Sequence, residues 1–209
     1  MAWPMWSIIL SRSWHFAMPA KTMLPHFSMM AKWHGHVNAV HAPVQMVDWL
    51  TNRSSLTARL VARSQQFRVQ RLYQGLSICL GDESVVIGLK REQKVVEREV
   101  LLRCDEQAVV YAHTVVPTTA NATQWPLFAA LGEKSLGTTL FSDPLVERGR
   151  LEYAKLRHNH PLMRRIAALQ ILDKQPAYLF ARRSVFRRKG GCLLVTEVFL
   201  PGIGNIGGL

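Results

Sequence analysis

The chain has 209 residues, 48% of them hydrophobic, and a formal net charge of +12 at pH 7. This length is enough for one domain with a sizeable core, and the hydrophobic content excludes a disordered chain. The three cysteines stand at no recognisable spacing, which indicates neither a disulfide framework nor a zinc site and favours a cytoplasmic location.

The start of the chain differs from the rest. Residues 1–42 hold four of the six tryptophans and no acidic residue, since the first acid is Asp48. We expect residues 1–42 to be an atypical extension that is disordered or that precedes a native start near Met29 or Met30. The apolar run at residues 5–10 is too short to span a bilayer, so no membrane insertion is expected.

Residues 43–201 are predicted to form one domain. Helical spacing of apolar residues predicts four helices, and alternation of apolar residues predicts strands. Ser54 or Ser55 is the predicted N-cap of the helix at residues 55–63. The predicted helices cover residues 43–50, 55–63, 123–131 and 162–172, and the predicted strands cover 66–73, 85–89, 95–103, 108–116, 185–188 and 192–200, with turns at 104–107 and 189–191. Hairpins with segregated helices are typical of an α+β fold with an antiparallel sheet.

Residues 202–209 are predicted to be a flexible, glycine-rich tail. They contain the dinucleotide-binding pattern GxGxxG, but only two residues follow it, which leaves no helix to receive a pyrophosphate. The pairs His34/His36 and His158/His160 have no nearby cysteine or acid to complete a metal site. We therefore expect no metal or nucleotide at these motifs.

The basic residues are unevenly distributed. Twelve lysines and arginines lie between Arg148 and Lys189, against two acids, Glu152 and Asp173. Such a charge first suggests nucleic acid, but no nucleic-acid motif is present and the basic residues are not interleaved with aromatic ones on one helix. We interpret this segment as a solvated face, with the alternative that its field steers an anionic substrate to the protein.

A carboxylate interrupts an apolar strand face near the C-terminus. With a period of two, Glu197 shares its face with Leu193, Val195 and Phe199. A carboxylate aligned with three apolar neighbours is expected to face the interior, where an unpaired charge costs several kcal/mol. A fold that keeps a charge there usually uses it.

Arg98 is the corresponding cation on another strand. It shares one face with Val96, Val100 and Leu102, whereas the other face, Glu97, Glu99, Leu101 and Arg103, is mixed and expected to be solvated. Two interpretations follow for Arg98 and Glu197. They form a buried structural ion pair, or they line a pocket for a small ligand that has a carboxylate at one end and a hydroxyl or ether at the other.

Five short blocks, at residues 98–102, 114–117, 136–141, 179–184 and 196–201, resemble the chorismate pyruvate-lyases in their order and spacing. The resemblance implies a single antiparallel sheet with helices packed on one face and a ligand enclosed beneath helical flaps. It also implies conversion of chorismate to 4-hydroxybenzoate and pyruvate, the first committed step of ubiquinone biosynthesis, without a metal or organic cofactor.

The same resemblance implies roles for four residues. Arg98 would bind the ring carboxylate of chorismate together with the backbone N–H groups of Leu56 and Leu136. Glu197 would contact the 4-hydroxyl as acid, base or hydrogen-bond partner. His113 stands where some members have arginine; we interpret it as a polar residue at the edge of the sheet, outside the site.

Two other classes of function remain open. A similar fold serves as a non-catalytic effector-binding domain in some transcription regulators, which carry a winged helix-turn-helix ahead of it; residues 1–47 show no such pattern. A basic nucleic-acid-binding module has only the charge in its favour. As an enzyme, the protein is expected to act on a small molecule as a monomer.

Overall fold

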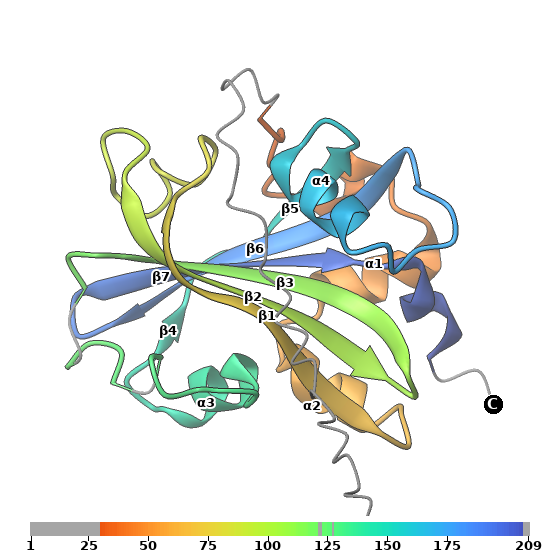
Figure 1. Ribbon diagram of the computed structural model, residues 1–209, viewed down its shortest axis with the longest axis horizontal. Helices are drawn as coiled ribbons and strands as arrows, with labels where there is room; N and C mark the ends of the chain where they lie inside the picture. The colour runs from red at the N-terminus through yellow and green to blue at the C-terminus, as the bar shows by residue number, and fades with distance from the viewer. Residues whose placement is uncertain (1–29, 121–122, 127, 207–209) are drawn as a thin grey trace, which may run out of the picture.

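A single antiparallel sheet organises the protein (Figure 1). The computed structural model describes residues 30–120, 123–126 and 128–206. The strands are β1 (Phe67–Ile78), β2 (Lys94–Cys104), β3 (Gln107–Pro117), β4 (Glu147–Arg148), β5 (Glu152–Arg157), β6 (Tyr178–Arg188) and β7 (Gly191–Phe199). They lie in the order β1-β2-β3-β7-β6-β4, with β5 also paired to β6. The predicted α+β class with one antiparallel sheet is confirmed.

Both predicted hairpins are present, and each closes with a two-residue turn. Asp105 and Glu106 join β2 to β3, and Lys189 and Gly190 join β6 to β7, all four with positive φ. Two consecutive positive φ angles match the right-handed twist of the flanking strands. The second turn is therefore one residue shorter than predicted, and β6 begins seven residues earlier, at Tyr178.

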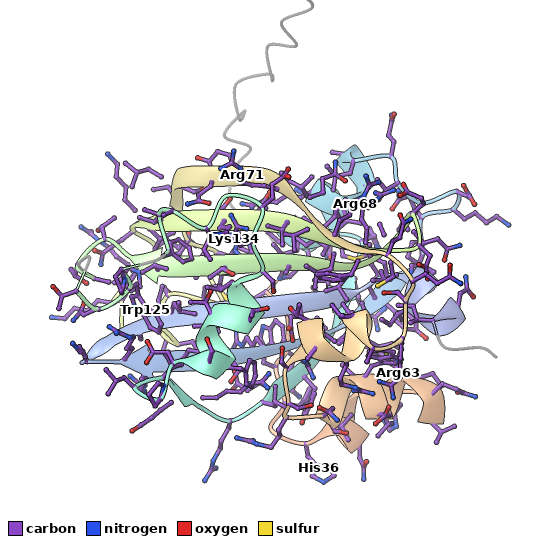
Figure 2. The ribbon with its side chains drawn as sticks, turned by 90° about the horizontal axis from the view of Figure 1, so that it is seen from below. His36, Arg63, Arg68, Arg71, Trp125 and Lys134 are labelled. Atoms are coloured by element: carbon purple, nitrogen blue, oxygen red, sulfur yellow. The ribbon has the colours of Figure 1, made fainter. Side chains whose placement is uncertain are left out.

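Of the four α-helices in the described part of the chain, three lie on one face of the sheet and one on the other. Figure 1 shows α2 (Leu56–Val61) and α3 (Leu136–Ser142) on the side opposite α4 (Pro161–Ala168). Seen from that side, α1 (Val44–Thr51) lies beside α2 in front of the strands (Figure 2). The predicted Ser55 cap is confirmed, because its hydroxyl accepts a hydrogen bond from the N–H of Ala58.

Each face has its own core. On the α1 side, Trp49 and Leu50 pack in one buried cluster with Val100 and Phe199. On the α4 side, buried residues of α4 pack against alternate residues of the same strands; this cluster includes Leu101, Tyr111, Leu162, Ile166 and Val198. The amphipathic α4 therefore closes the second face, so the helices are not confined to one side of the sheet.

Two predicted elements are wrong. Residues 85–89 were predicted to be a strand and residues 123–131 a helix, but turns and irregular backbone occupy the described residues of both segments. Each turn buries large side chains, Ile87 in the first segment and Trp125 and Phe128 in the second. Buried apolar residues in an irregular segment mimic the spacing of a regular element over such short runs.

The described ends of the chain also pack on the domain. His34 pairs with Tyr153 of β5, and η1 (Val37–Val40) buries both of its valines. After β7, η2 (Pro201–Asn205) buries Ile203 within the segment predicted to be a tail. The rest of the predicted extension, residues 1–29, and residues 207–209 lie outside the described residues. None of the helices in the described residues could span a bilayer.

Candidate active site

A cavity lies between the sheet and the helices α2 and α3. All four residues predicted for the site, Leu56, Arg98, Leu136 and Glu197, line it. The other lining residues are mainly apolar or hydroxyl-bearing and include Thr57, Val100, Thr114, Gly137, Leu140, Phe141, Arg148, Phe186 and Val195. Apolar walls with few polar groups are typical of small-molecule sites.

Arg98 is a buried cation with neutral partners. It is 2% exposed; Nη1 donates to Oε1 of Gln74 at 2.7 Å and to the carbonyl of Gly132 at 2.9 Å, and Nη2 donates to the carbonyl of Lys134 at 3.1 Å. Burial lowers the pKa of Arg98, and nearby Arg71 lowers it further. Among the described residues no carboxylate forms an ion pair with Arg98. The cavity therefore presents a positive charge that an anionic ligand would neutralise.

Glu197 is held by a different arginine. Its Oε2 accepts a hydrogen bond from Nε of Arg182 at 2.5 Å, and Arg182 is 1% exposed. Nη1 of Arg182 donates to the carbonyls of Trp49 and Asn52 at 2.9 and 2.7 Å. The structural ion pair considered between Arg98 and Glu197 is thus absent, because Glu197 pairs with Arg182 across the β6–β7 hairpin.

The helices α2 and α3 bring Leu56 and Leu136 to the cavity. Each is the first residue of its helix, where a backbone N–H has no acceptor within the helix. The hydroxyls of Thr57 and Ser135 lie 2.5 Å apart and tie the two helix starts together. A Cβ at Gly137 would come within 2.8 Å of Oγ1 of Thr57, so this close approach depends on glycine.

Comparisons with known proteins show which family the chain belongs to. The sequence model of a family described as chorismate lyase matches residues 28–205. The chain belongs to the chorismate lyase family.

Curated relatives in this family are similar over most of their length. A probable chorismate pyruvate-lyase of Ralstonia nicotianae is 50% identical over 159 residues, which cover 74% of this chain and 80% of the relative. One from Cupriavidus metallidurans is 44% identical over 177 residues, 84% of this chain and 82% of the relative. A solved structure, the C-terminal domain of the histidine utilization repressor of Pseudomonas syringae, is 11% identical with a TM-score of 0.49, over 66% of this chain and 93% of that chain, too distant to bear on function.

Arg148 is a cavity residue that the sequence analysis missed. It lies in β4, its guanidinium carbon is 5.4 Å from the ring centres of both Phe141 and Phe186, and Nη1 donates to the carbonyl of Arg53 at 2.8 Å. Burial lowers the pKa of Arg148 to about 10, although Glu197 opposes the shift. The basic segment that begins at Arg148 was predicted to be solvated, and that prediction is wrong for Arg148 and for the buried Arg182 and Arg183.

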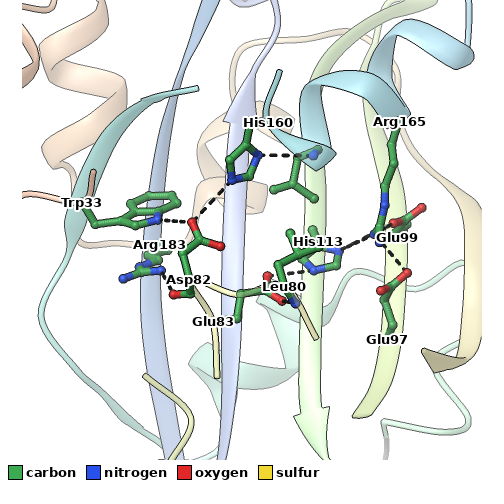
Figure 3. A network of polar contacts seen from close by, with 11 residues as sticks. Trp33, Leu80, Asp82, Glu83, Glu97, Glu99, His113, His160, Arg165 and Arg183 are labelled. Atoms are coloured by element: carbon green, nitrogen blue, oxygen red, sulfur yellow. Dashed lines mark hydrogen bonds and ion pairs between the residues drawn. The ribbon is translucent and has the colours of Figure 1, made fainter. Parts of the chain in front are cut away.

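The opposite face of the sheet carries a buried polar cluster (Figure 3). Glu97 is 0% exposed and Glu99 is partly buried, because Arg165 of α4 lies over both and donates to their carboxylates, at 3.1 Å to Glu97. The prediction that this face of β2 is solvated is therefore wrong. The charges are buried by α4, which the period of a single strand cannot reveal.

His113 belongs to the same cluster. It is fully buried on β3, a central strand, so its interpretation as an edge residue is wrong. Nε2 lies 2.9 Å from Oε1 of Glu83, and Nδ1 lies 3.6 Å from Oε1 of Glu99. Burial acts to lower the pKa of His113, but Glu83 and Glu99 outweigh it and raise the pKa to about 9.

The spacing of this cluster resembles that of a metal site. Ligand atoms of Glu97, Glu99 and His113 lie within 4.8 Å of one another. A metal needs a neutral imidazole, whereas His113 is protonated at neutral pH, and the cationic group of Arg165 already contacts both carboxylates. We interpret the cluster as an ion network that fastens α4 to the sheet.

Proposed function

We propose that this protein converts chorismate to 4-hydroxybenzoate and pyruvate. The observation that carries the proposal is Arg98, a buried cation with no carboxylate partner in the described chain, in the same cavity as Glu197. The relatives that share 44–50% identity are named probable chorismate pyruvate-lyases, which supports the same reaction for this chain.

The two ends of the cavity correspond to the two ends of the substrate ring. Chorismate has a ring carboxylate at one end, a 4-hydroxyl at the other, and an enolpyruvyl ether at C3. Arg98 lies opposite Thr114 of β3 and Glu197 opposite Ala112, two residues along the same strand, so their backbones are roughly 12 Å apart and their side chains can bracket one ring.

Arg98 binds the ring carboxylate in this proposal. A guanidinium and a carboxylate form short, charge-assisted hydrogen bonds that also fix orientation. The N–H groups of Leu56 and Leu136 complete the carboxylate site. Arg98 also bonds to the carbonyls of Gly132 and Lys134, which precede α3, so one side chain positions both the ligand and the segment that leads to Leu136.

Glu197 accepts a hydrogen bond from the 4-hydroxyl. Arg182 binds Oε2 of Glu197, and Oε1 has no hydrogen-bond partner among the described residues. The oxygen that remains is therefore available to the ligand, while Arg182 keeps the carboxylate in place.

The chemistry consists of an elimination. The C4–H and C3–O bonds break, a double bond forms between C3 and C4, and the ring becomes aromatic. The enolpyruvyl group leaves and gains a hydrogen at its methylene carbon to give pyruvate. Because aromatisation drives the reaction, the site has to supply orientation and charge stabilisation more than a strong base. The hydrogen passes either directly to the enolpyruvyl group or through Glu197.

Incubation with chorismate tests the proposal. We expect the absorbance of 4-hydroxybenzoate to appear together with one equivalent of pyruvate. Binding of chorismate without turnover would favour the alternative, a non-catalytic domain of this fold. We further propose that the product supplies ubiquinone synthesis in the cytoplasm; loss of the gene should lower ubiquinone, and added 4-hydroxybenzoate should restore it.

A further inference from the structure

Arg148 is the second cation of the cavity, beside Arg98. Its side chain is only partly exposed and lines the cavity with Phe141 and Phe186. Nε of Arg148 is buried and has no hydrogen-bond partner in the described part of the chain. A buried donor without an acceptor costs free energy unless a ligand completes it.

The charges of the cavity do not balance. Arg98, Arg148 and Glu197 are its charged lining residues, and Arg182 pairs with Glu197 from behind. Among the described residues, neither Arg98 nor Arg148 forms an ion pair. The side chains of the site thus carry an excess of two positive charges, which a dianion would neutralise and a monoanion would not.

The two unpaired arginines approach the ring from different directions. Arg98 lies on β2, whereas Arg148 lies on β4, at the other side of the sheet beyond β7 and β6. Arg148 and Glu197 line the same cavity, and β4 lies two strands from β7 but four from β2, which places Arg148 toward the end of the cavity that holds the 4-hydroxyl. The ether carbon C3 is adjacent to C4, so a substituent at C3 projects sideways at this end of the ring.

We propose that Arg148 binds the carboxylate of the enolpyruvyl group and so positions the leaving group of chorismate. This inference rests on the proposed function. The guanidinium, stacked on Phe141 and Phe186, presents its unpaired Nε to the second carboxylate, as Arg98 presents its charge to the first. After the ether bond breaks, the two products are monoanions, 4-hydroxybenzoate at Arg98 and pyruvate at Arg148.

The product distinguishes the two arginines, because 4-hydroxybenzoate keeps the ring carboxylate and lacks the second one. Arg148→Gln should lower kcat/KM for chorismate about 30-fold or more, through the loss of a buried charge-assisted hydrogen bond, and leave the Kd of 4-hydroxybenzoate unchanged. Arg98→Gln should raise both the KM of chorismate and the Kd of 4-hydroxybenzoate. Arg148→Lys, which keeps the charge, should recover part of the lost kcat/KM.

Arg150→Gln is the matched control. Arg150 is exposed, lies two residues from Arg148 and does not line the cavity. The substitution therefore removes the same charge from the same segment without changing the cavity. It should leave both measurements at the wild-type values. If kcat/KM for chorismate fell as much in Arg150→Gln as in Arg148→Gln, the effect would come from the overall positive charge of the segment. That result would overturn the inference.

Three further outcomes would count against Arg148. Equal losses of chorismate turnover and 4-hydroxybenzoate binding in Arg148→Gln would show a structural role, and unchanged kcat/KM would show no role. If Arg148→Gln does not fold, the same pair of measurements on Arg148→Lys decides between selective and equal loss. A wild-type protein that neither cleaves chorismate nor binds 4-hydroxybenzoate would overturn the proposed function itself, and this inference with it.

Discussion

Arg182 and Glu197 stand opposite each other in the register of β6 and β7, and the guanidinium of Arg182 also reaches the carbonyls of Trp49 and Asn52 at the end of α1. One buried side chain thus connects the position of a helix to the position of the carboxylate that lines the cavity. Carbonyls at a helix C-terminus carry partial negative charge, so they and Glu197 together compensate the burial of Arg182.

Replacing Arg182 by methionine should therefore destabilise the fold. It leaves Glu197 and three backbone carbonyls without their partner, and breaking a buried pair typically costs about 3–5 kcal/mol. Urea denaturation measures this cost. Arg187→Met, on the same strand but exposed, is the control and should change stability little. Equal stability of the two variants would contradict the structural part assigned to Arg182.

Glu197→Gln should lower kcat and leave the fold intact, because the amide oxygen still accepts the hydrogen bond from Arg182. The size of the loss separates the two roles left open for Glu197. A fall of about 100-fold or more indicates proton transfer, whereas about 10-fold indicates a hydrogen bond to the 4-hydroxyl. Steady-state kinetics with circular dichroism as the folding control gives the answer. If the variant fails to fold, the carboxylate is structural.

Arg98→Ala should weaken the binding of 4-hydroxybenzoate by about 2–5 kcal/mol, since the ligand carboxylate would lose a buried ionic partner. Isothermal titration calorimetry measures the change in Kd. Arg71→Ala provides the comparison, because Arg71 is exposed and acts on Arg98 only through its charge. Unchanged affinity in Arg98→Ala would mean that the carboxylate binds elsewhere.

The sequence identified the site residues that lie on long, regular strands. It did not identify those whose position depends on tertiary contacts. The period of two placed Arg98 and Glu197 on apolar faces, and both line the cavity. Leu56 and Leu136 were predicted only from the resemblance to the family. A backbone N–H group is present in almost every residue type, so the sequence does not mark the one that faces a cavity. Arg148 lies in a strand of two residues, which is too short for any period.

Arg182 could have been found from the sequence. A two-residue turn at Lys189 and Gly190 pairs Arg188 with Gly191, and the same register brings Arg182 opposite Glu197. A three-residue turn was predicted instead, and one residue of slip moves every partner to the other face. By contrast, nothing in β2 alone indicates that α4 covers Glu97.

Gly137→Ala should raise the KM for chorismate. The added Cβ would meet Oγ1 of Thr57 at 2.8 Å, so α2 and α3 would have to separate at the point where both begin. Gly204→Ala is the matched control, because nothing lies within 4 Å of a Cβ at that position. In the double variant Gly137→Ala/Thr57→Ala the oxygen is gone, and KM should return toward the wild-type value. A normal KM in the single variant would show that the helix starts can move apart without loss.

The buried pair of His113 and Glu83 makes stability depend on pH. The pKa of His113 is about 9 in the folded protein and about 6.5 in an unfolded chain, so the folded state holds the proton more tightly. The resulting stabilisation is complete below pH 6.5 and is lost as the pH rises through 9, a change of about 3 kcal/mol. Denaturation of the wild type and of His113→Gln between pH 6 and 9.5, roughly the span of the two pKa values, measures it. The free-energy difference between them should shrink toward high pH; a constant difference would show that His113 does not carry the proton.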